Sequence, residues 1–342
     1  MTRNNFILAL GTLLIAVLMS IPSPAQSGGG CWHFGTGFVP PFPLYTFDCA
    51  YMAYSYSWDC KIRDICPPPA ASRETYCASC AAAAAGHPIA LATGDTYIEE
   101  NDISVPGLGG GLALNRIWNS LWPATQLNSK VGLFGPNWRS SFEERVFSSG
   151  DGYVKYARRD GSFWSFAYTG SNNGTGWTTA APANVPATLI QGSSSWSLTF
   201  QNGEQRLFDM NSGNLTSIID RNGNTTQIVY DAIGRLVTVT DPAGRHLYFG
   251  YANNSSYLIT GVTSDFGISL SYTYDSQGRL TQVTKPDQTT INFEYDANSF
   301  ISAVKDTSGK VLESHTYDSS GHGLSSSRAN GVDSVTVSYP KQ

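Results

Sequence analysis

Two seven-residue stretches decide the fold: YDAIGRL at residues 230–236 and YDSQGRL at residues 274–280. In each, Asp follows an aromatic residue and Gly stands four positions after that aromatic residue. An Asp side chain caps a tight turn through its own oxygens, and Gly accepts the positive φ that many turns need. Each stretch therefore predicts a turn between two strands.

The same pattern recurs along the C-terminal part of the chain. Seven aromatic residues, here called the anchors, stand 22, 21, 23, 21, 22 and 22 residues apart: Phe208, Tyr230, Tyr251, Tyr274, Tyr295, Tyr317 and Tyr339. In the first unit the turn Gly slips by one position, to Gly213. A fixed period of this length is typical of a repeat protein.

Each unit holds a second turn and two runs of strand-forming residues. The second turns include 220–223, 241–244 and 306–309, and the run 289–295 alternates cleanly between polar and apolar residues. In the other run the apolar residues Leu280 and Val283 stand three apart, which indicates a bulge or a strong twist. We therefore predict an all-β fold of antiparallel hairpins, paired edge to edge into one curled sheet. The anchors should form a column of rings that serves packing, or alternatively a ligand-stacking platform.

The composition fits this fold. Only 14% of the 342 residues are charged, while 12% are aromatic, a mixture that favours strands and turns over exposed helices. The net charge is −5 and no run of Lys or Arg occurs, so we expect no nucleic-acid partner.

The N-terminus resembles an export signal. Arg3 precedes an apolar run of 14 residues, 6–19, and Ser23-Pro24-Ala25 resembles a cleavage site. A membrane anchor is the alternative, but the run is shorter than the ~20 residues that a membrane-spanning helix needs. We predict a signal peptide at 1–25, a secreted or cell-surface protein, and no membrane span after cleavage.

All six cysteines lie in the next segment, 26–85: Cys31, Cys49, Cys60, Cys66, Cys77 and Cys80. An even number in an exported chain predicts disulfides, although the pairing stays open. A zinc site or a redox pair at Cys77 and Cys80 remains an alternative, because two cysteines separated by two residues occur in both.

The motifs resemble those of the Rhs family, whose Tyr-Asp (YD) repeats occur in bacterial polymorphic toxins and in animal teneurins. Stretches 87–95, 100–108, 115–120 and 134–138 are similar to an uncharacterised domain that precedes the repeats in many Rhs proteins. The resemblance implies an Rhs-associated β domain at 86–200 and a YD-repeat array at 201–342.

Large relatives in this family form a spiralling sheet that closes into a shell around a toxic domain. This chain has about six units, and we expect these to be too few to wrap a cavity. The resemblance leaves two expectations open: a short surface protein, or the N-terminal portion of a polymorphic toxin that a downstream segment completes. The last hairpin should present an open edge and fray or self-associate beyond Tyr317.

No catalytic set is apparent in the sequence. The carboxylates at Glu99, Glu100 and Asp102 and at Glu143 and Glu144 are adjacent or nearly so, and we expect them to be solvated charges at sheet edges. Gly107 to Gly111 should be a turn between strands. We therefore predict an exported, non-enzymatic scaffold or interaction protein without cofactor or metal, whose partners are other YD-repeat segments or a cell-surface protein or glycan. A carbohydrate-binding module is a further alternative.

Overall fold

The computed structural model describes residues 47–52, 57–62, 84–85, 88–91, 93–121, 132–148, 153–160, 163–168, 176–181 and 185–339. The chain divides into two compact units, Met1–Pro67 and Pro68–Gln342. In the first unit, β1 (Phe47–Met52) and β2 (Ser57–Ile62) form an antiparallel pair in which the backbone of Cys49 lies opposite that of Cys60.

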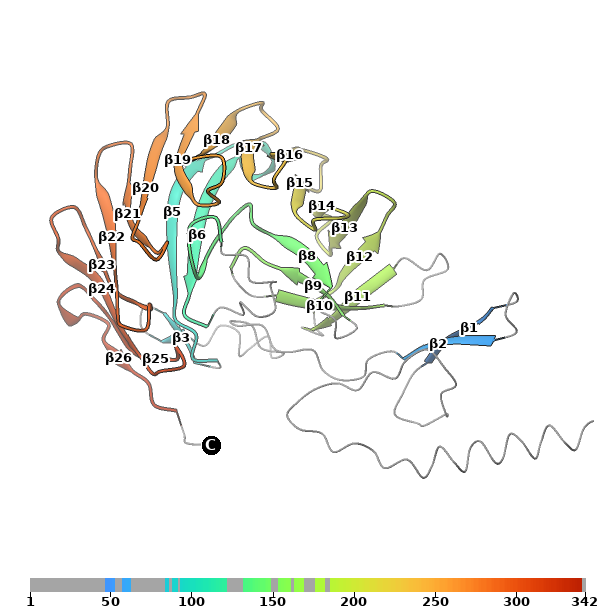
Figure 1. Ribbon diagram of the computed structural model, residues 1–342, viewed down its shortest axis with the longest axis horizontal. Helices are drawn as coiled ribbons and strands as arrows, with labels where there is room; N and C mark the ends of the chain where they lie inside the picture. The colour runs from blue at the N-terminus through green and yellow to red at the C-terminus, as the bar shows by residue number, and fades with distance from the viewer. Residues whose placement is uncertain are drawn as a thin grey trace, which may run out of the picture. The chain divides into compact units, whose positions relative to one another are not determined.

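One antiparallel sheet of 19 strands dominates the second unit (Figure 1). Its strands follow the chain order: β8 (Arg145–Ser148), β9 (Val154–Ala157), β10 (Phe163–Tyr168), β11 (Gly176–Ala181), β12 (Ala187–Gln191), β13 (Ser195–Phe200), β14 (Gln205–Asp209), β15 (Leu215–Ile219), β16 (Thr225–Tyr230), β17 (Leu236–Thr240), β18 (His246–Tyr251), β19 (Ile259–Ser264), β20 (Ser269–Tyr274), β21 (Leu280–Thr284), β22 (Thr290–Tyr295), β23 (Ile301–Lys305), β24 (Val311–Tyr317), β25 (Gly323–Arg328) and β26 (Val335–Thr336). Within the described residues, β8 pairs with β9 and β26 with β25, and no ladder joins β8 to β26. The sheet is therefore open, and the predicted all-β fold is confirmed.

A smaller sheet lies against the concave face of the large one. This inner sheet consists of β5 (Tyr97–Val105), β6 (Leu112–Asn119) and β7 (Trp138–Ser140), and Figure 1 shows β5 and β6 in cyan inside the curl. The turn between β5 and β6 contains the short 3-10 segment η1 (Leu108–Gly110), as expected for the glycine-rich stretch. Upstream, β3 (Ala84–Ala85) pairs with β4 (Ile89–Ala90).

The hydrophobic core fills the space between the two sheets. Aromatic rings of the inner sheet and its loops meet rings of the repeats edge to face: Phe134 with Tyr272, Trp138 with Phe293, Phe142 with Phe249 and Trp118 with Tyr317. Edge-to-face pairs are the favoured geometry of aromatic contacts. The concave side of the array is thus packed with protein along these strands.

Each repeat carries the bulge that the sequence predicts. The ladder slips by one residue just before every anchor from Phe208 to Tyr317, and the extra residue lies on the strand after the turn. In the unit of Tyr274, for example, Thr273 faces Gln282 and Tyr274 faces Leu280, which leaves Thr281 unopposed. The Thr281 hydroxyl donates to the carbonyl of Thr273 at 3.0 Å, so the bulge is itself hydrogen-bonded.

The anchors join each repeat to the one before it. Their hydroxyls donate to the carbonyl of the first strand residue of the preceding unit: Tyr251 to Leu236 at 2.7 Å, Tyr274 to Ile259 at 2.6 Å, Tyr295 to Leu280 at 2.8 Å, Tyr317 to Ile301 at 2.8 Å and Tyr339 to Gly323 at 2.7 Å. The anchors therefore stabilise the array through hydrogen bonds as well as through packing.

The expected column of touching rings does not form. Strands lie about 4.8 Å apart, so anchors two strands apart are separated by about 10 Å, which is too far for ring contact. Arginine side chains occupy part of this space instead. The guanidinium of Arg235 lies 4.5 Å from the ring centroid of Tyr251, and that of Arg279 lies 4.7 Å from that of Tyr295.

Backbone hydrogen bonds fasten the N-terminal segments to the array at three places. Leu215 and Val146 donate to the carbonyls of Glu144 and Gly213 at 3.2 and 2.9 Å, respectively. Farther along, Ile259 donates to Leu133 at 2.9 Å and Gly323 donates to Gly94 at 2.8 Å. The last contact lies beyond Tyr317, so this end of the array is held by the segment between β4 and β5.

No helix among the described residues is long and apolar enough to cross a bilayer.

The anchor hydrogen bonds lead to a first prediction. Replacing Tyr274 by Phe removes one hydroxyl that donates to a backbone carbonyl, and we expect this to lower the free energy of unfolding by about 1 kcal/mol in urea denaturation. Tyr274→Ala should cost about 3–5 kcal/mol because it also leaves a cavity. The control is Tyr248→Phe, at a strand position that is 43% exposed, and it should change little. Equal losses at Tyr274 and Tyr248 would contradict this role.

Candidate functional site

A buried ion pair lies at the centre of the contact between the two sheets. Arg116 of β6 donates two hydrogen bonds to Asp102 of β5, from Nε at 2.5 Å and from Nη2 at 2.9 Å. The Tyr272 hydroxyl of the large sheet donates to the same carboxylate at 2.7 Å. Both charged side chains are almost inaccessible, at 0% and 1% exposure, so the pair is a polar lock in the hydrophobic core.

Aromatic rings surround the guanidinium of this lock. The ring centroid of Trp138 lies 4.6 Å from Arg116, and those of Phe134 and Tyr272 lie at 5.5 Å. Burial by itself would lower the pKa of Arg116, but the Asp102 carboxylate beside it outweighs burial and raises that pKa. Arg116 is therefore charged throughout the physiological range, and Asp102 is its counter-ion.

No sequence pattern predicted this lock, and the predicted solvent-exposed environment of its carboxylate, Asp102, is wrong. Asp102 was expected among solvated edge charges, whereas its side chain is buried beneath Arg116. Glu144 was expected there as well, and it is buried with its Oε2 accepting bonds from the Tyr156 hydroxyl at 2.7 Å and from Arg206 Nε at 3.2 Å. The physical reason is that the inner sheet is covered by the repeats, so its charges must find partners inside the protein.

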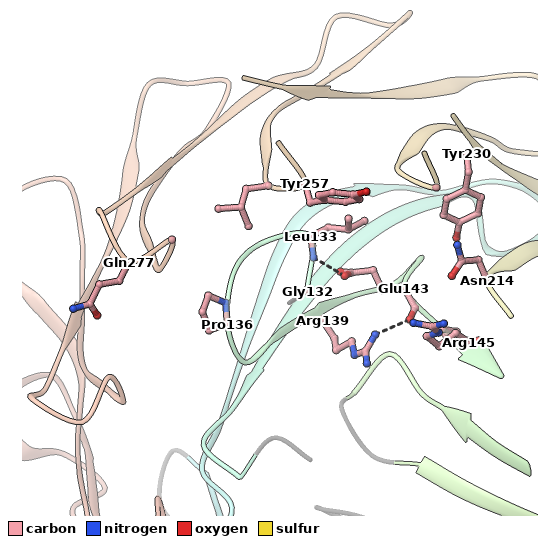
Figure 2. Close-up of a pocket in the computed structure, with 14 residues that line it drawn as sticks. Gly132, Leu133, Pro136, Arg139, Glu143, Arg145, Asn214, Tyr230, Tyr257 and Gln277 are labelled. Carbon is pink, nitrogen blue, oxygen red and sulfur yellow. Dashed lines mark hydrogen bonds between the residues drawn. The ribbon is translucent and has the colours of Figure 1, made fainter. Parts of the chain in front are cut away.

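A cavity of about 620 Å³ opens beside the segment 132–145. Figure 2 shows Leu133 and Tyr257 on one side of this cavity and Glu143, Arg139 and Arg145 on another. Asn214 and Tyr230 contribute from the first repeats. The cavity thus lies between the segment 132–145 and the repeat turns.

Glu143 is fixed at the floor of the cavity. Its Oε1 accepts a hydrogen bond from the Leu133 amide at 2.7 Å, and Arg139 donates to its backbone carbonyl at 3.2 Å. Burial raises the pKa of Glu143 above its ordinary value of 4.5, against the opposing effect of the Arg139 charge. Burial also lowers the pKa of Arg139 to about 10.

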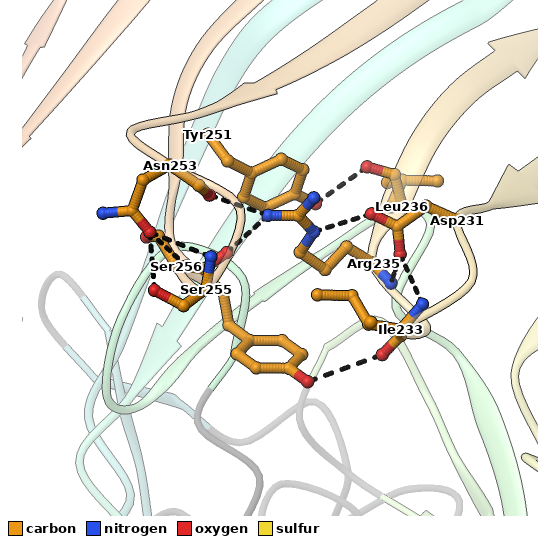
Figure 3. A network of polar contacts seen from close by, with 9 residues as sticks. Asp231, Ile233, Arg235, Leu236, Tyr251, Asn253, Ser255 and Ser256 are labelled. Carbon is orange, nitrogen blue, oxygen red and sulfur yellow. Dashed lines mark hydrogen bonds and ion pairs between the residues drawn. The ribbon is translucent and has the colours of Figure 1, made fainter.

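The repeat turns carry a second polar network. Asp231 accepts bonds from the amides of Ile233 and Arg235 at 3.1 and 2.9 Å and from the Arg235 side chain at 2.7 Å (Figure 3). The other end of Arg235 donates to the carbonyls of Asn253 and Ser256, so the turn is tied to the next unit. These Asp residues are turn formers, as the sequence predicts.

Some of the remaining predicted sites lie within the described residues and others lie outside them. Of the six cysteines, only the backbones of Cys49 and Cys60 lie within the described residues, and the disulfides stay a prediction. The proposed signal peptide lies outside the described residues. Within the described part of the chain, no three His, Cys, Asp or Glu side chains are close enough to hold a metal ion. His246 and His322 instead contact Asp265 and Asp318 at 2.9 and 2.8 Å.

Comparison with known protein families agrees with this architecture. The domain of unknown function DUF6531 matches residues 86–166, which hold the inner sheet and the start of the large one. The RHS Repeat matches residues 211–246 and 258–290. The chain is an Rhs-repeat protein. The resemblance seen in the sequence is thereby confirmed for both regions.

Relatives of this Rhs-repeat protein include two Bacillus proteins. The tRNA nuclease WapA of Bacillus subtilis (strain 168) is 29% identical over 140 residues, which cover 41% of this chain and 6% of the relative. The tRNA3(Ser)-specific nuclease WapA of Bacillus spizizenii has the same identity and coverage. The match therefore spans only about 6% of the length of these curated relatives.

Two solved structures align with much of this chain, both with low TM-scores. The TcdB2-TccC3-Cdc42 crystal structure aligns with 83% of this chain and 15% of its own at 14% identity, with a TM-score of 0.28. The Photorhabdus luminescens Tc holotoxin pore with the TccC3-D651A mutation aligns with 79% of this chain and 14% of its own at 16% identity, with a TM-score of 0.27.

The relatives correct one prediction. The absence of a catalytic motif led to the expectation that the protein is not an enzyme, and this is contradicted because the matched curated relatives are named tRNA nucleases. The matched region is a small fraction of those proteins, so a missing motif within it says little about the activity of the whole. The coarser conclusion is that this is an Rhs-repeat protein.

The buried lock leads to a second prediction. Arg116→Met leaves the buried Asp102 carboxyl without its counter-ion, and we expect a loss of about 3–5 kcal/mol in the free energy of unfolding. Adding Asp102→Asn to Arg116→Met should recover part of this loss, because no uncompensated charge then remains. Lys305→Met is the control, since its pair with Glu294 is partly exposed and should be worth under ~1 kcal/mol. Additive losses from Arg116→Met and Asp102→Asn would contradict the lock.

The raised pKa of Glu143 leads to a third prediction. A carboxyl whose pKa is higher in the folded than in the unfolded state binds its proton more tightly when folded, so ionisation costs stability. Relative to wild type, Glu143→Gln should gain stability as the pH rises above 4.5, and the gain should level off above the folded-state pKa. Thermal unfolding from pH 4 to 8 measures this. Asn214→Ala, a neutral change in the same cavity, should give a pH-independent difference; the same pH profile in both variants would rule out Glu143 as the source.

Proposed function

We propose that this Rhs-repeat protein is an exported, toxin-related protein in which the two sheets together form a rigid scaffold. The observation that carries the proposal is the lock of Arg116, Asp102 and Tyr272, which joins strands 170 residues apart in the chain. A buried ion pair with three directional hydrogen bonds to one carboxylate favours one arrangement of the elements that it joins. A curled array held from inside in this way keeps its shape outside the cell.

The export part of the proposal is supported by the sequence. Arg3 and the apolar run 6–19 precede a small-residue site at 23–25, as in secreted proteins. The location we propose is the cell surface or the extracellular space. Proposed partners are other YD-repeat segments or a surface protein or glycan.

The toxin-related part is supported by the relatives named as tRNA nucleases. The activity to look for is therefore cleavage of tRNA in neighbouring cells. In this proposal the scaffold residues act by holding the protein in an export-competent, stable form, and substitutions that release the lock abolish the biological effect.

A competition experiment provides the fourth prediction. A strain that makes and releases the wild-type protein is grown with a strain that lacks the gene and its neighbours, and tRNA from the second strain is examined for cleavage. We expect the producer to win and target tRNA to be cut. Arg116→Met should abolish both effects, whereas Lys305→Met should preserve them.

Immunoblotting of the culture supernatant controls for export and stability of each variant. Equal growth of both strains, with the wild-type protein present in the supernatant and target tRNA intact, would contradict the proposal. Retention of the protein in the cytosol would refute the export part separately.

A further inference from the structure

The hairpin of β1 and β2 brings two of the six cysteines to facing positions. The antiparallel register sets the backbone of Cys49 in β1 directly opposite that of Cys60 in β2 (Figure 1, blue). The cysteine count by itself leaves the pairing of all six open. The register of this hairpin therefore selects one pair among them.

The spacing across an antiparallel ladder suits a disulfide. Directly opposite residues have Cα atoms about 4.5 Å apart at non-hydrogen-bonded positions and about 5.5 Å apart at hydrogen-bonded positions. A disulfide joins residues whose Cα atoms are about 4.4–6.8 Å apart. Both kinds of position fall within this range, so the backbone of the hairpin does not have to move for the bond to form.

The residues on either side of the cysteines support this register. Successive positions of a strand belong to opposite faces, so the cysteine pair shares its face with the pairs two positions away. These neighbouring pairs are Phe47 with Ile62 and Tyr51 with Trp58. The face that holds the cysteines is therefore apolar along the length of the hairpin.

The charged residues of the hairpin belong to the other face. Asp48 is paired with Lys61 in the ladder. Opposite charges at facing positions stabilise the register that brings them together. A slip of one residue would exchange the faces of one strand and separate Asp48 from Lys61. The sequence thus favours the one arrangement that also sets Cys49 against Cys60.

A bond between the strands would stabilise this hairpin. β1 and β2 form a sheet of two strands, and among the described residues no third strand pairs with it. A two-stranded hairpin by itself is only marginally stable in water. A cross-link removes extended conformations from the unfolded state, and this favours the folded hairpin.

We propose that Cys49 and Cys60 form a disulfide that fastens β1 to β2. One of the two thiolates attacks the disulfide of an oxidised thiol–disulfide oxidoreductase or of oxidised glutathione, which gives a mixed disulfide and releases one thiol of the oxidant. The second thiolate attacks the protein sulfur of the mixed disulfide, forms the bond within the chain and releases the other thiol. Two electrons and two protons pass from the protein to the oxidant, so the reaction balances.

The reaction needs an oxidising compartment in the cell, and in this respect it rests on the proposed export. The choice of Cys60 as the partner of Cys49 rests on the register alone.

The fifth prediction concerns the cross-linked peptide. The full chain is collected from culture supernatant, its free thiols are blocked with N-ethylmaleimide, and it is digested with trypsin and pepsin without reduction. Tyr51 and Trp58 provide pepsin sites between the two cysteines, and Lys61 provides a trypsin site after Cys60. We expect mass spectrometry to find the Cys49 peptide joined to the Cys60 peptide, lighter by two hydrogen atoms than the two reduced peptides together.

Three variants of the full chain identify the partners. Cys49→Ser should leave one free thiol, at Cys60, and Cys60→Ser should leave one free thiol, at Cys49. Cys31→Ser is the matched control, since it removes a cysteine of the same segment and should leave the peptide that joins Cys49 to Cys60 unchanged.

Oxidation of the reduced full chain in a glutathione buffer repeats the mapping without export. Absence of the protein from the supernatant, with the same linked peptide formed in the buffer, would refute the export and leave the pair standing. Three results would each overturn the pair: Cys49 or Cys60 linked to another cysteine in the wild-type chain, a free thiol elsewhere than Cys60 in Cys49→Ser, or free thiols at both positions after oxidation in the buffer.

Discussion

The bulge opposite each anchor is the constraint on which the rest of the structure depends. One extra residue on the strand after the turn that follows each anchor from Phe208 to Tyr317, such as Thr281, shifts the ladder and increases the local twist of the strand. The same shift places the anchor hydroxyl beside the carbonyl that opens the strand of the preceding unit, as with Tyr274 and Ile259. Each repeat is therefore twisted by its own bulge and fixed to its neighbour by its own anchor, and the sheet curls as a result.

A curled sheet has a concave face, and that face must be covered. Apolar side chains of the repeats point into it, and the inner sheet supplies the opposing rings and the lock of Arg116 with Asp102. The energetic consequence is mutual dependence. In the described part of the chain, the three strands of the inner sheet bury the pair of Arg116 and Asp102 beneath the repeats, and the repeats bury apolar side chains against the inner sheet. We infer that the two regions fold as one cooperative unit, although the sequence divides them near residue 200.

The repeats could be predicted from the sequence because their signals are local. Turn residues, the alternation of 289–295 and the offset between Leu280 and Val283 all act within one hairpin, and the turns and bulges were found where these signals placed them. The lock could not be predicted, because Asp102 and Tyr272 are 170 residues apart and no local pattern links them. A large separation in the sequence also explains why Glu144 was wrongly predicted to be solvated, since its partner Arg206 lies 62 residues away.

Departures from the repeat pattern show where the array meets something else. In the first unit the turn Gly slips to Gly213, where an added Cβ would lie 1.9 Å from the carbonyl oxygen of Val146. At Gly323, where earlier units have Leu or Ile, a Cβ would lie 2.2 Å from the Thr96 hydroxyl.

The longest spacing, 23 residues between Tyr251 and Tyr274, holds the loop with Tyr257 and Leu258 that walls the cavity. Each irregularity thus coincides with a contact that a regular hairpin would block or could not reach. In this array, these three breaks in the period mark where the N-terminal segments contact the repeats and where the cavity wall is formed.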